Sequence, residues 1–133
     1  MSENLDLVRS IYAAWERGDY SSVEWADPAI EYVVADGVEP GIWKGRAEME
    51  KVLGSILDLW DDPRIEVDEC RELDDSRVLV LNHLHAKGKT SGVDIGGMLR
   101  NGAAVLHLRN RRVTKYVSYW DRERALADLG LKG

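Results

Sequence analysis

Glu31 is the carboxylate in this sequence whose position best suits acid–base chemistry. It lies in the segment Ala29 to Val34, whose residues are typical of a β-strand. If the side chain points inward among tryptophan and tyrosine rings, desolvation would raise its pKa and allow proton transfer near neutral pH. If it points outward, it is an ordinary exposed glutamate. Glu31 is therefore the candidate catalytic residue, and both orientations are open.

The aromatic side chains predict a binding pocket. The sequence contains no Phe but five Trp and five Tyr, and the N–H or O–H of such a ring needs a partner when it is buried. A ligand-filled cavity would provide that partner, whereas an ordinary core with polar tips at the surface is the alternative. Aromatic walls with a few polar groups fit a flat, largely apolar ligand such as an aromatic or polycyclic ketone. The candidate binding residues are Tyr12, Trp15, Tyr32, Trp43, Trp60, Asn82, Tyr116, Ser118 and Trp120.

The three histidines could indicate a zinc site or a general base. His83 and His85 share one face of a predicted strand, and His107 lies on the next strand. Strand alternation places all three on the outer face and turns Asn82 inward, so we predict no metal site. The glycines lack the spacing of a phosphate-binding loop, and we predict no cofactor. Asp121 precedes Arg-Glu-Arg-Ala-Leu and is predicted to cap the last helix.

The composition argues against several classes of protein. A net charge of −6 is unlike that of a nucleic-acid-binding surface. Cationic residues form one short cluster, made of Arg109, Arg111, Arg112 and Lys115. Cys70 stands alone, so no intrachain disulfide can form, and we expect a cytoplasmic protein. The sequence shows neither a signal-peptide pattern nor a run of about 18 apolar residues, so no membrane partner is expected.

Apolar periodicity predicts an α+β fold in which residues 1–133 form one domain. Helices are predicted for residues 2–17, 46–60 and 122–129, with a short helix or turn at 20–25. Strands are predicted for residues 29–34, 65–73 and 78–87, and for a hairpin over 98–120 that turns at 110–111. A curved, mostly antiparallel sheet wrapped on the N-terminal helices would form a cone-shaped barrel with a pocket.

The second strand of that hairpin has two different faces. One mixes rings with hydroxyls, which suits a cavity wall: Thr114, Tyr116, Ser118 and Trp120. The other suits core packing or contact with a second copy of the chain: Val113, Lys115, Val117 and Tyr119. We therefore expect a homodimer.

Five segments of the chain resemble the nuclear transport factor 2-like superfamily, in its SnoaL-like polyketide cyclase and ketosteroid-isomerase-like branch. They are IYAAWERGD (Ile11 to Asp19), ADPAIEY (Ala26 to Tyr32), WKGRAEM (Trp43 to Met49), SGVD (Ser91 to Asp94) and VTKYVSYWDRERALADLGL (Val113 to Leu131). The resemblance implies a cone-shaped α+β barrel, often dimeric, with a pocket between sheet and helices. Because this fold hosts isomerases, cyclases, epoxide hydrolases, dehydratases and non-catalytic binders, it does not by itself assign an activity.

The sequence departs from the catalytic positions of that branch. Ketosteroid-isomerase-like enzymes use a tyrosine on the first helix and an acid on the hairpin to hold an enolate oxygen, with an aspartate base on the first strand. The matching positions are Ile11, Ala104 and Val33, which cannot perform these roles. Epoxide-hydrolase-like members carry an aspartate where this chain has Ser118. Trp120 resembles the aromatic wall residue of the isomerase branch.

These observations favour a domain that binds a small hydrophobic molecule. Any catalysis would be cofactor-free proton transfer of the isomerase, cyclase or dehydratase type, with Glu31 as the acid–base and Asn82, Ser118 or a tyrosine hydroxyl orienting a carbonyl. The alternative is a non-catalytic binding or dimeric assembly module whose pocket is filled by side chains.

Overall fold

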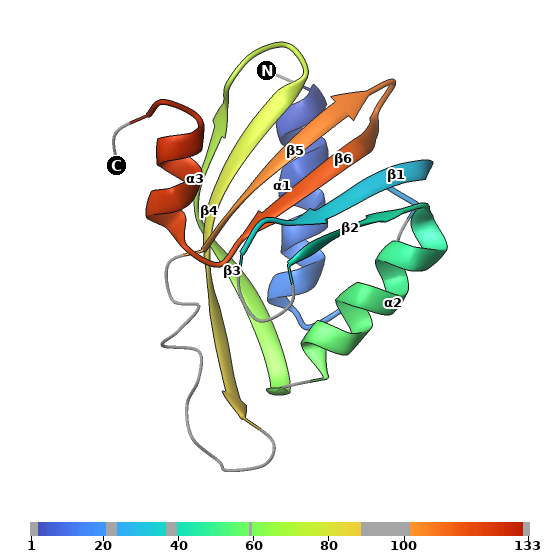
Figure 1. Cartoon of the computed structure of the whole chain (residues 1–133), viewed down its shortest axis with the longest axis vertical. Helices are drawn as coiled ribbons and strands as arrows, with labels where there is room; N and C mark the ends of the chain where they lie inside the picture. The colour runs from blue at the N-terminus through green and yellow to red at the C-terminus, as the bar shows by residue number, and fades with distance from the viewer. Residues whose placement is uncertain (1–2, 21–23, 37–39, 59, 89–101, 132–133) are drawn as a thin grey trace.

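The computed structural model describes residues 3–20, 24–36, 40–58, 60–88 and 102–131, without the side chains of 56, 57, 60–63 and 84–88. It contains three helices and six strands among these residues (Figure 1). The helices are α1 (Glu3–Glu16), α2 (Arg46–Leu57) and α3 (Arg122–Asp128). The strands are β1 (Ala26–Val34), β2 (Gly41–Lys44), β3 (Trp60–Glu72), β4 (Arg77–Gly88), β5 (Gly102–Arg109) and β6 (Arg112–Tyr119). The predicted α+β class is confirmed.

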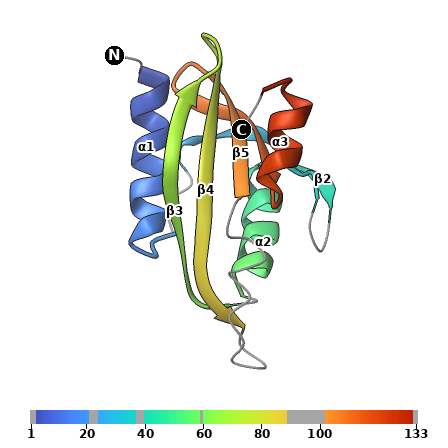
Figure 2. The ribbon, with the colours of Figure 1, turned by 90° about the vertical axis from the view of Figure 1, so that its left-hand side faces the viewer.

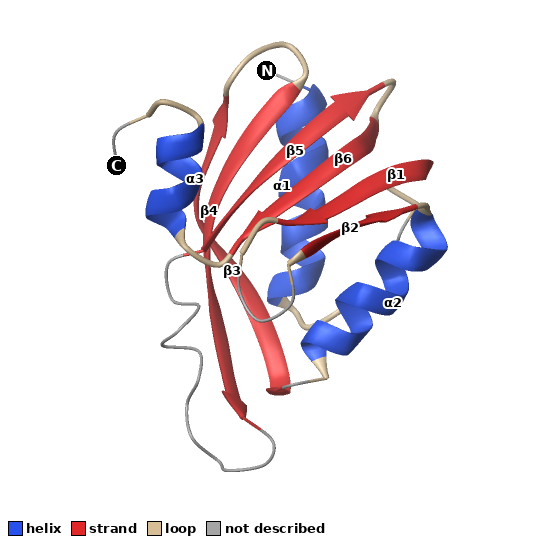
Figure 3. Ribbon diagram, viewed as in Figure 1, coloured by secondary structure: helices blue, strands red, loops and turns tan. Residues whose placement is uncertain are grey.

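The six strands form one mixed sheet in the order β2-β1-β6-β5-β4-β3. Neighbours are antiparallel except β1 and β6, which run parallel although most of the chain separates them. Helices α1 and α2 pack on one face, here called the inner face, and α3 packs on the other, the outer face. Figure 2 shows α1 and α3 on opposite sides of β3 and β4, and Figure 3 distinguishes the helices from the strands by colour. No described helix has both the length and the apolar character needed to cross a membrane.

The main hydrophobic core lies between the inner face and the helices. Helix α1 contributes the stripe Val8, Ile11, Tyr12 and Trp15, which the apolar spacing of the sequence predicts. Helix α2 adds Met49, which is fully buried. Burial of each such side chain stabilises the fold by roughly 1.5–3 kcal/mol before conformational entropy is subtracted. Packing on the sheet is thus what makes these amphipathic segments helical.

A smaller core joins the outer face to α3. Tyr119 and Val117 of β6 pack there with Ala125 and Leu126 of the helix. The helix begins as predicted, because the Asp121 side chain accepts a hydrogen bond from the Glu123 backbone N–H and so caps it. Val117 and Tyr119, two of the residues predicted for a dimer contact, thus pack against α3 of the same chain. A homodimer stays a prediction.

A β-bulge in β6 corrects a second expectation. The register shifts between the pairs His107–Lys115 and Leu108–Val113, so that β6 holds one extra residue, Thr114. Between the bulge and the β5–β6 turn, the side chains of β6 therefore face the opposite way to the predicted alternation. Val113, predicted to face outward, is fully buried in the inner core.

Two predicted boundaries also differ from the structure. Helix α2 ends at Leu57, and Trp60 begins β3 instead of closing the helix. Pro63 lies within β3, which is an edge strand of the sheet, the place where a missing N–H is tolerated. Strand β2 was not predicted, because its four residues lie next to a loop rich in glycine and proline.

We expect Arg111→Gly to stabilise the protein. Asn110 and Arg111 form the two-residue turn between β5 and β6, with positive φ angles of 52° and 64°. Glycine is favoured at the second position of such a turn. Removing the strain should raise the free energy of unfolding by about 0.5–1 kcal/mol. The measurement is urea unfolding.

Glu3→Gln is the control for that experiment. It removes the exposed ion pair between Glu3 and Arg111, whose N–O distance is 2.9 Å, without changing the turn. Exposed pairs of this kind contribute about 0–1 kcal/mol. The interpretation of the turn is wrong if Arg111→Gly loses as much stability as Glu3→Gln.

Candidate functional site

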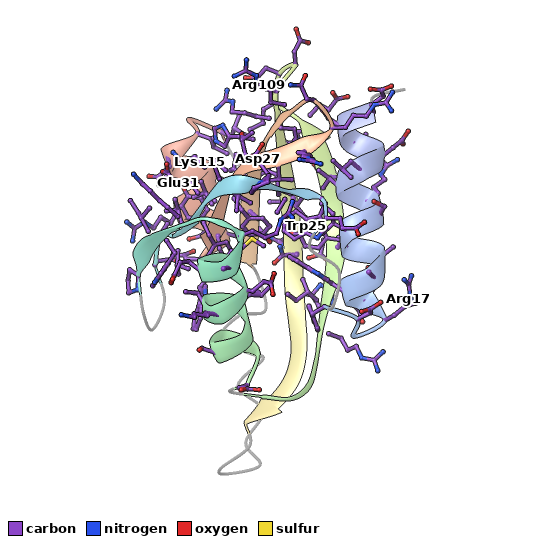
Figure 4. The ribbon with its side chains drawn as sticks, turned by 90° about the vertical axis from the view of Figure 1, so that its right-hand side faces the viewer. Arg17, Trp25, Asp27, Glu31, Arg109 and Lys115 are labelled. Carbon is purple, nitrogen blue, oxygen red and sulfur yellow. The ribbon has the colours of Figure 1, made fainter. Side chains whose placement is uncertain are left out.

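Four of the nine predicted binding residues meet in one aromatic cluster in the inner core. The ring centroid of Trp15 lies 4.9 Å from that of Tyr12 and 6.0 Å from that of Tyr116. Tyr32 lies 5.4 Å from Tyr116 on the neighbouring strand. Trp25, which was not predicted, lies 6.0 Å from Trp15, and Figure 4 shows it near the start of β1. Tilted and edge-to-face contacts at these distances stabilise aromatic clusters.

A hydrogen bond between two phenols lies at the centre of the cluster. The hydroxyl oxygens of Tyr12 and Tyr116 are 2.5 Å apart, and both side chains are buried. Burial raises the pKa of Tyr12, while its hydrogen bonds with Tyr116 and Asn82 act in the opposite direction. Burial also raises the pKa of Tyr116 well above its ordinary value. Both phenols therefore stay protonated at physiological pH and can donate hydrogen bonds.

The other predicted binding residues are placed as follows. Asn82 is half-buried on β4 and turns inward toward Tyr12, as predicted. Ser118 is half-buried opposite Ala104 and Val34, two residues of the inner face. Trp43 packs against the edge of the inner core. The backbone N–H of Trp120 donates to Asp36 Oδ1 at 2.6 Å, and the Trp60 side chain lies outside the described part of the chain.

A groove between α1 and β3 reaches Tyr12. Its volume is about 430 Å3. The lining residues are Arg9, Tyr12, Ala13, Glu16, Val67, Asp68, Glu69 and Cys70. The Glu16 carboxylate accepts the Val67 backbone N–H at 3.1 Å, which ties the helix to the strand. Burial raises the pKa of the Cys70 thiol, against the effect of the Arg9 charge and hydrogen bond.

Sequence reasoning missed the polar residues of this groove. Arg9 and Glu16 lie three residues before and four residues after Tyr12, which puts all three on one side of α1. That spacing was readable from the sequence. The presence of Cys70 in the groove could not be predicted from the sequence, because it depends on which strand packs against α1.

Glu31 does not face the aromatic cluster, so the inward orientation is wrong. Its neighbour Tyr32 takes the inner face, and alternation turns Glu31 outward. There its Oε1 lies 4.0 Å from Lys115 Nζ, with 37% of the Glu31 side chain exposed (Figure 4). Of the three isomerase positions, Ile11 and Ala104 are apolar members of the inner core. Val33 shares the outward parity of Glu31.

The outer face carries a polar network that includes one histidine. His83 Nδ1 lies 2.8 Å from Asp68 Oδ1, and Arg122 of α3 donates to Asp68 Oδ2 at 2.6 Å. Burial works to raise the pKa of Asp68, but the Arg122 hydrogen bond and the His83 charge outweigh it and the pKa is lowered. The same Arg122 side chain donates to the backbone carbonyl of Asn82 at 2.9 Å. The network therefore connects β3, β4 and α3.

The outer-face prediction holds for two histidines. His83 belongs to the network just described, and His107 is half-buried on β5, where burial and then the charges of Lys115 and Arg77 lower its pKa. The side chain of His85 lies outside the described residues. Within the described ranges, no three His, Cys, Asp or Glu side chains are grouped as metal ligands.

The arrangement of these elements matches that of known structures. An NTF2-like protein of unknown function from Burkholderia pseudomallei is 21% identical over 96% of this chain and 97% of its own, with a TM-score of 0.77. TerC, co-crystallized with polyporic acid, is 20% identical over 96% and 98%, with a TM-score of 0.74. This chain has the nuclear transport factor 2-like fold.

A further structure with this fold shows how far the sequences diverge. A protein from Catenulispora acidiphila with a ketosteroid isomerase-like fold, in complex with trimethylamine, is 14% identical over 96% of this chain and 94% of its own. Its TM-score is 0.68. No protein-family model and no curated protein matches the sequence. The similarity therefore establishes the fold and leaves activity to be argued from the residues.

We expect Asp68→Asn to destabilise the protein in a pH-dependent way. The folded pKa of Asp68 is lower than its unfolded value, so its stabilising contribution is complete above the ordinary aspartate pKa of about 3.9 and is lost as pH falls through the folded pKa. The loss of stability on mutation should therefore be largest near neutral pH and should shrink below about pH 4.

Urea unfolding of both forms at several pH values measures this difference. Asp75→Asn is the matched control, because it makes the same chemical change at an exposed residue in the turn between β3 and β4. A pH-independent difference, or an equal one for Asp75→Asn, would contradict the role given to Asp68.

Proposed function

We propose that this protein binds a small, largely apolar molecule with a carbonyl oxygen in the groove between α1 and β3, with Tyr12 donating a hydrogen bond to that oxygen. The observation that carries the proposal is the buried phenol pair, one member of which lines the groove. The groove volume of about 430 Å3 suits a small molecule.

The hydrogen-bond inventory of the phenol pair supports a donor role. Two hydroxyl protons are present, and one of them is used between the two oxygens. If Tyr116 and Asn82 both donate to the Tyr12 oxygen, the Tyr12 proton remains to be given to a ligand. Because both phenols have raised pKa values, this site would stabilise a carbonyl or a partly negative oxygen without ionising itself.

The chemistry around Tyr12 favours the same class of ligand. Ala13 and Val67 supply apolar surface to the groove beside Tyr12. Arg9 brings a positive charge to the groove, and the Glu16 carboxylate already accepts the Val67 N–H. Two proteins of the same fold are complexes with small organic molecules, polyporic acid and trimethylamine.

We expect Tyr12→Phe to weaken ligand binding by about three- to tenfold, the size of one neutral hydrogen bond. A thermal-shift screen of aromatic ketones and quinones would identify a ligand, and calorimetry would give its Kd. Tyr119→Phe is the matched control. It removes a phenol hydroxyl that donates to Asp128 at 3.0 Å on the outer face.

Two outcomes would contradict the proposal. In the first, Tyr12→Phe and Tyr119→Phe bind the ligand equally well. In the second, no aromatic carbonyl compound shifts the unfolding temperature, which would favour the alternative of an assembly module with a filled core.

We expect Glu31→Gln to leave the ligand Kd within about twofold of wild type, because exposed pairs such as Glu31 with Lys115 contribute little. Any turnover should be kept as well, since Glu31 lies on the face opposite the phenol pair. The same calorimetric titration tests the affinity. A large loss of affinity or turnover would show that Glu31 takes part in ligand binding or catalysis.

A further inference from the structure

A second groove lies on the outer face, where the start of β1 meets the β5–β6 hairpin. Its volume is about 580 Å3. The lining residues are Asp27, Ala29, Arg109, Asn110, Arg112 and Thr114. It shares no lining residue with the groove between α1 and β3, so it is a separate candidate site.

Two arginines bring adjacent positive charges to this groove. Arg109 and Arg112 are directly opposite each other in the β5–β6 register, and the two-residue turn between them fixes that register. The preceding pair, Leu108 and Val113, points into the inner core, so the arginine pair points to the outer face. The side chains of opposed residues begin about 4.5–5.5 Å apart, and like charges at that spacing repel each other.

No acidic side chain within the described ranges forms an ion pair with Arg109 or Arg112. Arg111, between the two in sequence, is paired with Glu3. Among the described residues, neither Arg109 nor Arg112 has an ion pair or a side-chain hydrogen bond. Asp27 lies on β1 in the same groove (Figure 4), where its Oδ1 accepts a backbone N–H at 2.8 Å. An oxyanion between the guanidinium groups would relieve the repulsion and could be held by both.

We propose that this groove binds the phosphate group of a small, hydroxylated phosphate ester. Two guanidinium groups match the two negative charges of a phosphomonoester, and the Asn110 amide is a further donor. Asp27 and Thr114 supply acceptors, because Thr114 Oγ1 donates its own proton to the His107 carbonyl at 3.3 Å and keeps lone pairs for a ligand. Acceptors beside an anion site favour a ligand that carries hydroxyl groups next to its phosphate.

Titration of the whole protein with glycerol 3-phosphate, followed by amide NMR shifts at constant ionic strength, tests this proposal. We expect saturable shifts at Asn110, Arg112 and Thr114, and no shifts with glycerol. Inorganic phosphate should bind at the same residues but more weakly, because it lacks the neighbouring hydroxyl groups. Arg109→Gln and Arg112→Gln should each weaken binding by roughly tenfold, the effect of losing one charge-assisted hydrogen bond.

Arg111→Gln is the matched control, because it removes an equal charge from the same hairpin at a residue that does not line the groove. It should leave the affinity within about twofold of wild type, since Arg111 does not line the groove and its charge is already paired with Glu3. The proposal is overturned if the hairpin amides do not shift, if inorganic phosphate binds as tightly as the ester, or if Arg111→Gln weakens binding as much as the other two variants. All three arginines are exposed, so none of these substitutions should prevent folding.

Discussion

The hydrogen bond between Tyr12 and Tyr116 is the constraint on which the inner core depends. A buried hydroxyl without a partner costs about 1–3 kcal/mol, and each of these phenols is a partner for the other. Tyr12 comes from the first helix and Tyr116 from the last strand. This polar contact therefore joins α1 to β6. Trp15 and Tyr32 then pack around this contact.

The two faces of the sheet have different chemical characters. The inner face is apolar except for phenol, amide and hydroxyl groups, and within the described part of the chain no charged side chain is buried. The outer face carries ion pairs, including those that join Asp68 to Arg122 and Glu31 to Lys115. Neutral donors inside and charged groups outside suit two different classes of ligand, because a charge is costly to desolvate in an apolar core and inexpensive at a surface.

The sequence predicted the fold class, the stripe of α1, the cap of α3 and the inward orientation of Asn82, because each depends on a local period or a local hydrogen bond. It failed at Val113, since a bulge reverses alternation without leaving a sequence signal. The sequence did not decide whether Glu31 points inward or outward. Alternation shows that neighbouring side chains of a strand lie on opposite faces, but it does not show which face is the core. The α1–β3 groove depends on tertiary docking, which periodicity does not describe.

The parallel pairing of β1 with β6 has a consequence for how the chain is made. Tyr32 is a register partner of Tyr116. Strand β1 can therefore pair with β6 only after all the residues between them have been synthesised. Contacts between such distant residues slow folding, because a long loop must close before they form. During synthesis, β1 and β2 emerge from the ribosome with one edge unpaired, and that edge can pair with another chain. The sheet therefore becomes continuous only once β6 has been synthesised and has paired with β1.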